Sequence, residues 1–222
     1  MVEHTTPNTS ILPPSTPLPG SLTYWGFQSL RSIGRAMTIL PALWKEYGEL
    51  SGASAVVLLA HSIGAMMATI TAGSYTGTEG YSYSLAGLIT SGIGAEMNLS
   101  HTQSFTNLIE PGASHGNFDP VKDQMMLKIP NMSLADPEVT KHSARLNKPA
   151  PVGGIMEIST TWLRDWHRHS HQVKVPLKYG VSEFDELWSS TPDAPEKWRD
   201  AFLLSPRVEC GIVPNALADG ML

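Results

Sequence analysis

Ser62 is the residue of this sequence whose surroundings best suit nucleophilic chemistry. The stretch before it, residues 55–60, is short, apolar and uninterrupted, which is typical of a central parallel strand covered on both faces. After the serine, apolar side chains recur at steps of three and four residues, which is helical periodicity. A buried strand that turns sharply into a helix at a serine predicts a nucleophile elbow of the form Gly-x-Ser-x-Gly.

Small residues stand two positions before and two positions after this serine. Ala60 and Gly64 are expected to let the strand and the helix approach closely. The serine hydroxyl would then project beyond the strand, and the amide of Ile63 at the helix N-terminus would donate to an oxyanion. The alternative interpretation is that Ser62 only caps the helix, a position that serine often occupies.

A serine nucleophile needs a base beside it, and the histidines of this chain are unusually distributed for that role. His61 lies inside the predicted elbow, where its side chain is expected to point away from the serine hydroxyl. The others fall in the N-terminal tail or in the central part of the chain, and none follows residue 171. These are His4, His101, His115, His142, His167, His169 and His171.

The elements that would position Ser62 form an α/β pattern. Apolar runs predict further strands at 85–90, 173–179 and 208–213, and a strand–helix–strand succession indicates a parallel sheet with a right-handed crossover. Helical patterns cover 24–50, interrupted by Pro41, and 191–204. The predicted fold class is therefore α/β, with a mainly parallel sheet and flanking helices.

Two segments fall outside this pattern. Residues 1–20 contain five prolines and are expected to form a loop or a disordered tail, which leaves 21–222 as a single domain. Residues 96–172 show no repeated strand signal, although short helices are expected at 125–127 and 155–163. An insertion of this length is usually a functional cap, so we expect a helical lid here.

Composition argues against several classes of partner. The formal net charge is −5 and the 15 basic residues form no long run, which argues against a nucleic-acid or anionic-membrane partner. No stretch approaches the roughly 20 apolar residues of a membrane-spanning helix. A single cysteine, Cys210, and the lack of a secretory signal at the N-terminus favour the cytoplasm. No phosphate-binding glycine loop is present, so no nucleotide cofactor is expected, and the oligomeric state is left open.

The chain resembles the α/β-hydrolase superfamily, and within it is similar to the hydrolases of fungal secondary-metabolite clusters. The resemblance covers about residues 24–213, and its best-matched motifs are 59–65, 88–95 and 175–185. It implies the chain order nucleophile, acid, histidine, with Ser62 as the nucleophile and Asp185 as the acid. Glu183 is the fallback acid, and the alternative for Asp185 is a loop carboxylate that caps the next segment.

The sequence departs from the family pattern at both ends. The family base follows the last strand, yet residues 214–222 hold no histidine, and no convincing strand precedes Ala55, so the chain looks like a shortened member. We expect a serine hydrolase of esterase or thioesterase character acting on a small lipophilic substrate, with a non-standard base: His167, His169 or His171. The alternative is a catalytically impaired protein of this fold with a binding role.

The same three histidines raise the question of a metal site. On an extended segment His167, His169 and His171 would face one side and meet one Zn²⁺, with Asp165 to spare. On a helix the same spacing would spread them around the axis. Because Arg164, Trp166 and Arg168 indicate a solvated polar face, no metal is expected.

Overall fold

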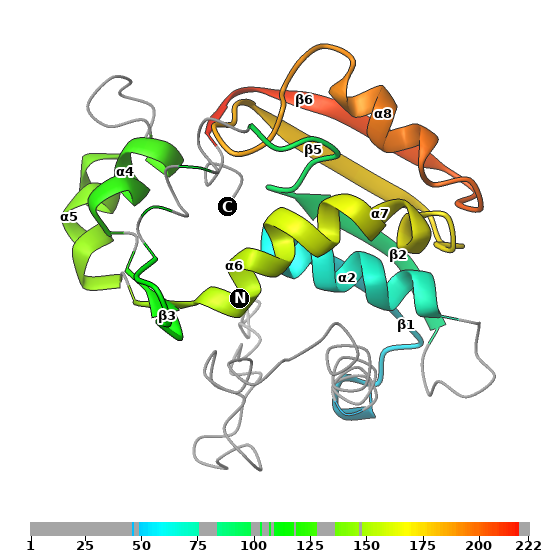
Figure 1. Ribbon diagram of the computed structural model, residues 1–222. Helices are drawn as coiled ribbons and strands as arrows, with labels where there is room; N and C mark the ends of the chain where they lie inside the picture. Colours follow the sequence, from blue (N-terminus) through cyan, green and yellow to red (C-terminus); the bar gives the residue numbers. More distant parts are fainter. Residues whose placement is uncertain are drawn as a thin grey trace, which may run out of the picture.

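A computed structural model of the chain describes residues 49–75, 84–98, 109–117, 119–127, 136–146 and 148–217, together with the single residues 46, 103 and 107. The predictions for 1–20 and for most of 24–50 lie outside these residues. The centre of the described part is a four-stranded sheet with the order β1-β2-β5-β6, in which every pair is parallel (Figure 1). Its strands are Ala55–His61, Ser84–Ser91, Leu177–Phe184 and Val208–Leu217.

The predicted parallel sheet is thus confirmed, with one strand displaced. The strand expected at 173–179 begins only at Leu177, whose amide donates to the Arg207 carbonyl at 2.9 Å. Pro176 has no N–H to donate to a ladder, although its carbonyl accepts from Leu88 at 2.9 Å. Val173 and Val175 are both buried, so the sequence alternates between buried and exposed residues as in a strand. They lie, however, in the turn that precedes β5.

One face of the sheet is covered by a layer of helices (Figure 1). Trp198 joins this layer to the sheet, since its ring stacks on Tyr179 of β5 at 4.5 Å between centroids and on Trp166 of α7 at 4.9 Å. The layer consists of α2 (Ile63–Ser74), α6 (Val152–Met156), the π-helical turn η2 (Glu157–Trp162), α7 (Leu163–Ser170) and α8 (Ala194–Asp200).

This layer includes part of the segment in which a lid was expected. α7 packs on α2, and Trp162 and Trp166 are almost fully buried in the core cluster. The expectation that Trp166 lies on a solvated polar face is therefore wrong. Residues 158–170 thus contribute buried side chains to the core, and the lid stays a prediction for the rest of 96–172.

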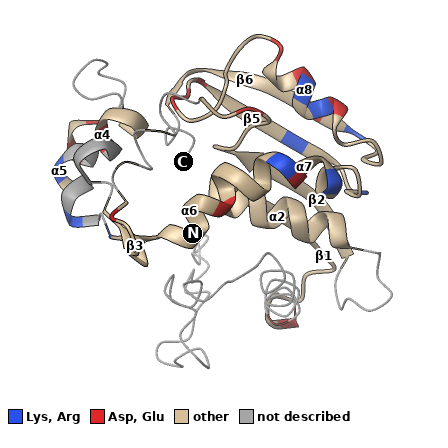
Figure 2. Ribbon diagram, viewed as in Figure 1, with Lys and Arg blue, Asp and Glu red and all other residues tan. Residues whose placement is uncertain are grey.

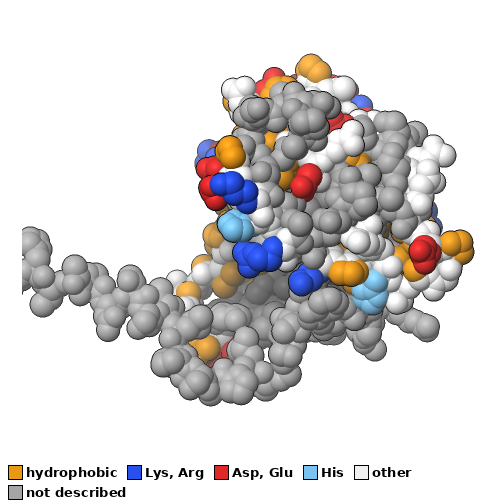
Figure 3. All heavy atoms as spheres, turned by 90° about the vertical axis from the view of Figure 1, so that its left-hand side faces the viewer, with side chains coloured by type: hydrophobic (Ala, Val, Ile, Leu, Met, Phe, Trp, Pro, Cys, Tyr) orange, Lys and Arg blue, Asp and Glu red, His pale blue; other side chains and the backbone are white. Residues whose placement is uncertain are grey.

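A smaller group of elements lies to one side of the sheet (Figure 1). It contains the antiparallel pair β3 (His115–Gly116) and β4 (Ala150–Pro151) with the helices α4 (Asp119–Leu127) and α5 (Pro137–Leu146). On the face that Figure 3 presents, acidic and basic side chains lie interspersed and do not gather into a patch of one sign.

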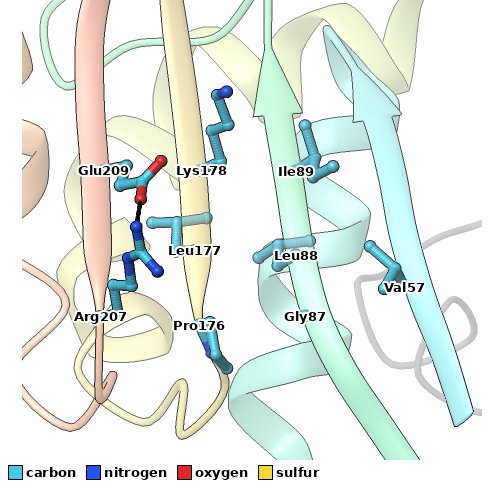
Figure 4. A pocket seen from close by; sticks show the side chains of 9 residues that line it. All are labelled: Val57, Gly87, Leu88, Ile89, Pro176, Leu177, Lys178, Arg207 and Glu209. Atoms are coloured by element: carbon cyan, nitrogen blue, oxygen red, sulfur yellow. Dashed lines mark ion pairs between the residues drawn. The ribbon is translucent and has the colours of Figure 1, made fainter.

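The opposite face of the sheet carries no helix among the described residues (Figure 4). Val57 and Leu59 of β1 are 55% and 75% exposed there, and Ile89 of β2 is 37% exposed. Neither β1 nor α2 carries a Lys, Arg, Asp or Glu side chain (Figure 2). A cavity of about 200 Å³ lies on this face between Val57 and the ion pair of Arg207 with Glu209 (Figure 4). We refer to this face as the open face.

The contact between α2 and α7 depends on Gly73. A Cβ added to this glycine would lie 2.4 Å from the carbonyl oxygen of His169, a backbone atom that cannot move aside alone. Gly73→Ala is therefore expected to destabilise the fold by about 1–3 kcal/mol, the usual effect of overpacking. The matched control is Gly64→Ala in the same helix, where a Cβ would meet nothing within 4 Å. That change should be neutral or stabilise by up to about 1 kcal/mol, and urea unfolding of both variants tests the difference.

Candidate active site

Ser62 stands at the junction of β1 and α2 with a strained backbone. Its φ is 54° and its ψ is −128°, and Asn215 is the one other non-glycine residue with a positive φ in the described part of the chain. Such a conformation costs on the order of 1–3 kcal/mol and persists only where the surroundings enforce it. The Ser62 side chain makes no capping hydrogen bond to α2. The geometry is that of the predicted elbow and does not support the alternative of a helix cap.

The elbow is held by backbone hydrogen bonds on both sides. The Ser62 amide donates to the Ser91 carbonyl at 2.9 Å, and the Ser62 carbonyl accepts from Ala65 and Met66 at 2.8 and 3.2 Å. Ile63 is the first residue of α2, so its amide is one of those that helical geometry leaves without an intrahelical acceptor. Gly64 is not required for close packing of the strand and the helix, because a Cβ at this position would meet nothing within 4 Å.

The ends of β1 and β2 are joined by side chains as well. His61 lies opposite Ser91 in the parallel register, and its Nδ1 is 2.9 Å from Ser91 Oγ. Gly92 follows with a φ of 62°, and a Cβ there would lie 2.3 Å from Cε1 of the imidazole. Residues 88–95 carry one motif of the resemblance, but the contact between Gly92 and His61 was not predicted, because the register that sets His61 beside Ser91 is a tertiary property.

Asp185 directly follows β5, at the same edge of the sheet as Ser62. The side chain is 7% exposed, and its Oδ1 accepts from the amides of Leu187 and Trp188, each at 2.9 Å. These bonds fix the carboxylate in the turn. They match the alternative interpretation of a capping carboxylate, and the acid role of Asp185 stays a prediction.

The loop that carries Asp185 is tied to the loop that follows β2. Asn98 donates its amide to the Leu187 carbonyl at 2.8 Å, and Ser189 donates to the Glu96 carbonyl at 2.9 Å. A Cβ on Gly94 would lie 3.0 Å from Cβ of Trp188, which shows how closely the two loops pack. The position of Asp185 is therefore coupled to β2, the strand that also anchors Ser62.

Glu183, the fallback acid, has a structural role in this arrangement. Its Oε2 accepts from the amide of Asn215 at 2.8 Å, at the point where β6 bends with a φ of 55°. Its carbonyl accepts from Ser190 Oγ at 3.0 Å. The side chain thus holds the end of β6 against β5.

Tyr179 is a buried residue near the site that the sequence did not single out. Its hydroxyl donates to the Ile93 carbonyl at 2.8 Å, across to the loop after β2. Burial raises the pKa of this phenol, and the nearby negative charge of Asp185 raises it further. A group so weakly acidic holds its proton and acts as a fixed donor.

The three histidines expected near Asp185 are not brought to Ser62. A Cβ on Gly73 would touch His169, which places this part of α7 beside the C-terminal end of α2, whereas Ser62 precedes its first residue. A helix of 12 residues spans about 18 Å, well beyond the reach of an imidazole. The expectation that His167, His169 or His171 acts as the base for Ser62 therefore disagrees with the structure.

The same segment also lacks the extended geometry that a three-histidine metal site would need. His167 and His169 lie in α7 and His171 caps it, so His167 and His171 share one side of the helix and His169 lies on another. The rings of His167 and His171 approach to 5.8 Å, and the pKa of His167 is lowered by burial and by the charge of His171. Within the described residues, no three His, Cys, Asp or Glu side chains converge on one point.

None of the described helices combines the length and the apolar character that crossing a membrane would require.

Comparison with known proteins identifies the fold. No family model and no curated protein matches the chain. It is similar to a thermostable carboxyl esterase from Bacillus coagulans, with a TM-score of 0.52 and 17% identity over 82% of this chain and 62% of the esterase. It is also similar to a monoglyceride lipase from Saccharomyces cerevisiae, with a TM-score of 0.54 and 11% identity over 84% of this chain and 60% of the lipase.

A third solved structure, E-2-(acetamidomethylene)succinate hydrolase, has a TM-score of 0.54 and 13% identity, over 86% of this chain and 69% of that protein. The chain thus spans less than two thirds of the length of the esterase and of the lipase. At these identities the likeness concerns the fold. With its parallel sheet, its helical layer and its strained serine between β1 and α2, the chain has the α/β-hydrolase fold.

Proposed function

We propose that this protein is a serine hydrolase of esterase or thioesterase character, with Ser62 as its nucleophile. The observation that carries the proposal is the positive φ of Ser62, 54°, at a sharp strand-to-helix turn. Strain of this kind at a polar residue is characteristic of functional sites, where it presents a side chain that a relaxed turn would not expose. A serine with a merely structural role has no need of it.

In the proposed reaction, Ser62 Oγ attacks the carbonyl carbon of the substrate and the leaving group departs as an alcohol or a thiol. The amide of Ile63 donates to the oxyanion that forms, an interaction of the type that contributes about 3–4 kcal/mol to the transition state. Asp185 orients the imidazole of the base. Because α7 contacts the C-terminal end of α2, away from Ser62, the proposed reaction uses none of the α7 histidines as its base, and no base is assigned to it.

The substrate is proposed to be small and lipophilic. Two of the three neighbours named above act, by their names, on carboxyl esters and monoglycerides, which supports this class. The group formed by α4, α5, β3 and β4 is proposed as the lid. A place in secondary-metabolite biosynthesis, and a cytoplasmic location, rest on the sequence alone.

Labelling with a fluorophosphonate tests the proposal. The wild-type protein should acquire a phosphonyl adduct on Ser62, and Ser62→Ala should lose the adduct at that position. The matched control is Ser74→Ala at the other end of α2, where the hydroxyl donates to the Ile70 carbonyl at 2.9 Å. That variant should be labelled at Ser62 like the wild type. Correctly folded wild-type protein that remains unlabelled at Ser62 would contradict the proposal.

The second candidate is a protein of the same fold that binds a ligand without turning it over. The observation that favours it is the position of His167, His169 and His171 at the far end of α2 from Ser62. This candidate predicts that Ser62→Ala leaves the biological activity of the protein intact. Loss of that activity in a folded Ser62→Ala variant would argue against it.

A further inference from the structure

The structure contains a serine that already has an imidazole beside it, and this serine is Ser91. Its Oγ lies 2.9 Å from His61 Nδ1, and the two residues are direct partners in the register of β1 and β2. In the tautomer that carries its proton on Nε2, the Ser91 hydroxyl donates to Nδ1. A hydroxyl that donates to a neutral imidazole is the arrangement by which serine nucleophiles are activated.

The imidazole of His61 is held in this position from a second direction. A Cβ on Gly92 would lie 2.3 to 2.8 Å from three ring atoms, so the ring packs directly on the Cα of that glycine. The strand register and the glycine together fix the distance between base and hydroxyl. Such preorganisation distinguishes a working pair from a chance contact.

The pair belongs to the open face of the sheet. Side chains alternate along a strand, so His61 shares a face with Leu59 and Val57, the exposed residues of β1. Ser91 helps to line a cavity of about 450 Å³, a volume in the usual range for small-ligand sites. The cavity is also lined by Leu59, Ile89, Lys178, Gly180 and Gly211.

Two glycines line this cavity, one on β5 and one on β6. Across the sheet Ser91 is level with Gly180, and Gly180 is level with Gly211. A Cβ on Gly211 would meet nothing within 4 Å, so there is open space above the strand beside the serine. Leu59 and Ile89 make part of the lining apolar, which suits an acyl chain, and Lys178 and Glu209 are its charged residues.

We propose that Ser91, activated by His61, is a second nucleophile that accepts the acyl group of small, mainly apolar carboxylic esters bound on the open face. The site is distinct from the elbow at Ser62, because it lies on the face away from α2. It does not rest on the proposed function of Ser62.

The chemical step balances without a further reagent. Ser91 Oγ forms a bond to the ester carbonyl carbon while its proton passes to His61 Nδ1, and the C–O bond to the leaving group breaks. The departing alkoxide takes the proton from His61 and leaves as the alcohol. Water then attacks the acyl-serine, His61 again receives and returns a proton, and the products are the carboxylic acid and free Ser91.

The experiment uses an ethyl fluorophosphonate on the full chain of Ser62→Ala, followed by chymotryptic digestion and tandem mass spectrometry. Cleavage after Tyr75 or Tyr81 places positions 62 and 91 on different peptides. We expect a phosphonyl adduct on Ser91 that Ser91→Ala removes. His61→Gln, which keeps a hydrogen-bonding group but no base, should slow the formation of this adduct at least tenfold.

An internal control is provided by Ser114, whose Oγ also lies 2.9 Å from an imidazole Nδ1, that of His115, but at an exposed position. Ser91 should react at least tenfold faster than Ser114, and equal rates would overturn the proposal. An unmodified Ser91 in folded Ser62→Ala would also overturn it, and this readout requires no His61 variant. Because adducts at 62 and 91 are read on separate peptides, failure here is distinguishable from failure at Ser62.

Discussion

Ala218→His is expected to raise the rate of ester hydrolysis by about 100- to 10,000-fold, the contribution that a positioned general base makes. Leu217 lies opposite Phe184 in the parallel register of β6 and β5. Asp185 is the first residue after β5, and position 218 is the first after β6, the last described strand. Ala218 itself lies outside the described residues. The resemblance to the α/β-hydrolases likewise puts the base after the last strand.

Turnover of p-nitrophenyl butyrate measures this gain. Ala218→Gln, of similar size but without a basic nitrogen, should remain at the level of the wild type. Removing the orienting carboxylate in the double variant Ala218→His/Asp185→Asn should abolish most of the gain. If a folded Ala218→His variant is labelled at Ser62 but turns over no faster than the wild type, the assignment of Asp185 as the acid is wrong.

Gly92→Ala is expected to destabilise the protein by about 3 kcal/mol and to slow labelling of Ser62. An L-residue at a φ of 62° costs about 1–2 kcal/mol. The new Cβ, 2.3 Å from His61 Cε1, must also displace the imidazole, which breaks its hydrogen bond to Ser91 at a cost of about 0.5–1.5 kcal/mol. Because the Ser91 carbonyl holds the Ser62 amide, the disturbance reaches the elbow.

Gly112→Ala is the matched control for this change. Gly112 has a φ of 81°, but a Cβ there would meet nothing within 4 Å. It should therefore show only the backbone effect of about 1–2 kcal/mol in urea unfolding, with labelling of Ser62 unchanged. Equal destabilisation by the two substitutions would mean that the contact between Gly92 and His61 adds nothing to stability.

Much of the sheet could be predicted because its strands are apolar in sequence. The runs at 55–60 and 85–90 coincide closely with β1 and β2. The prediction that 55–60 is a central strand covered on both faces is wrong, because β1 lies at the edge of the described sheet and Leu59 is 75% exposed. The start of β5 was misplaced because Val173 and Val175 are buried in a turn, and burial produces the same alternation. The core role of Trp166 was missed because its neighbours on α7 are charged and the helix buries only one narrow stripe.

The site was predictable only where its residues are local in sequence. Ser62 and Ile63 follow from a strand-to-helix pattern, and Asp185 from the resemblance. The pairing of His61 with Ser91 depends on a register between two strands, and the anchoring of Asn215 by Glu183 depends on another. Neither register can be predicted from the spacing of residues along the chain. That His167, His169 and His171 lie on a helix was likewise known only from the structure.

The exposed position of β1 has a consequence for how the protein would lose activity on heating. Among the described residues, β1 pairs with β2 alone, and the Ser62 amide is bonded to the last residue of that same neighbour. Strands at the margin of a sheet open locally at lower free energy than the central strands do. Fraying of β1 would release the strained φ of Ser62 while the tryptophan core remains folded. Inactivation would then precede global unfolding, with early hydrogen exchange at the amide of Ser62.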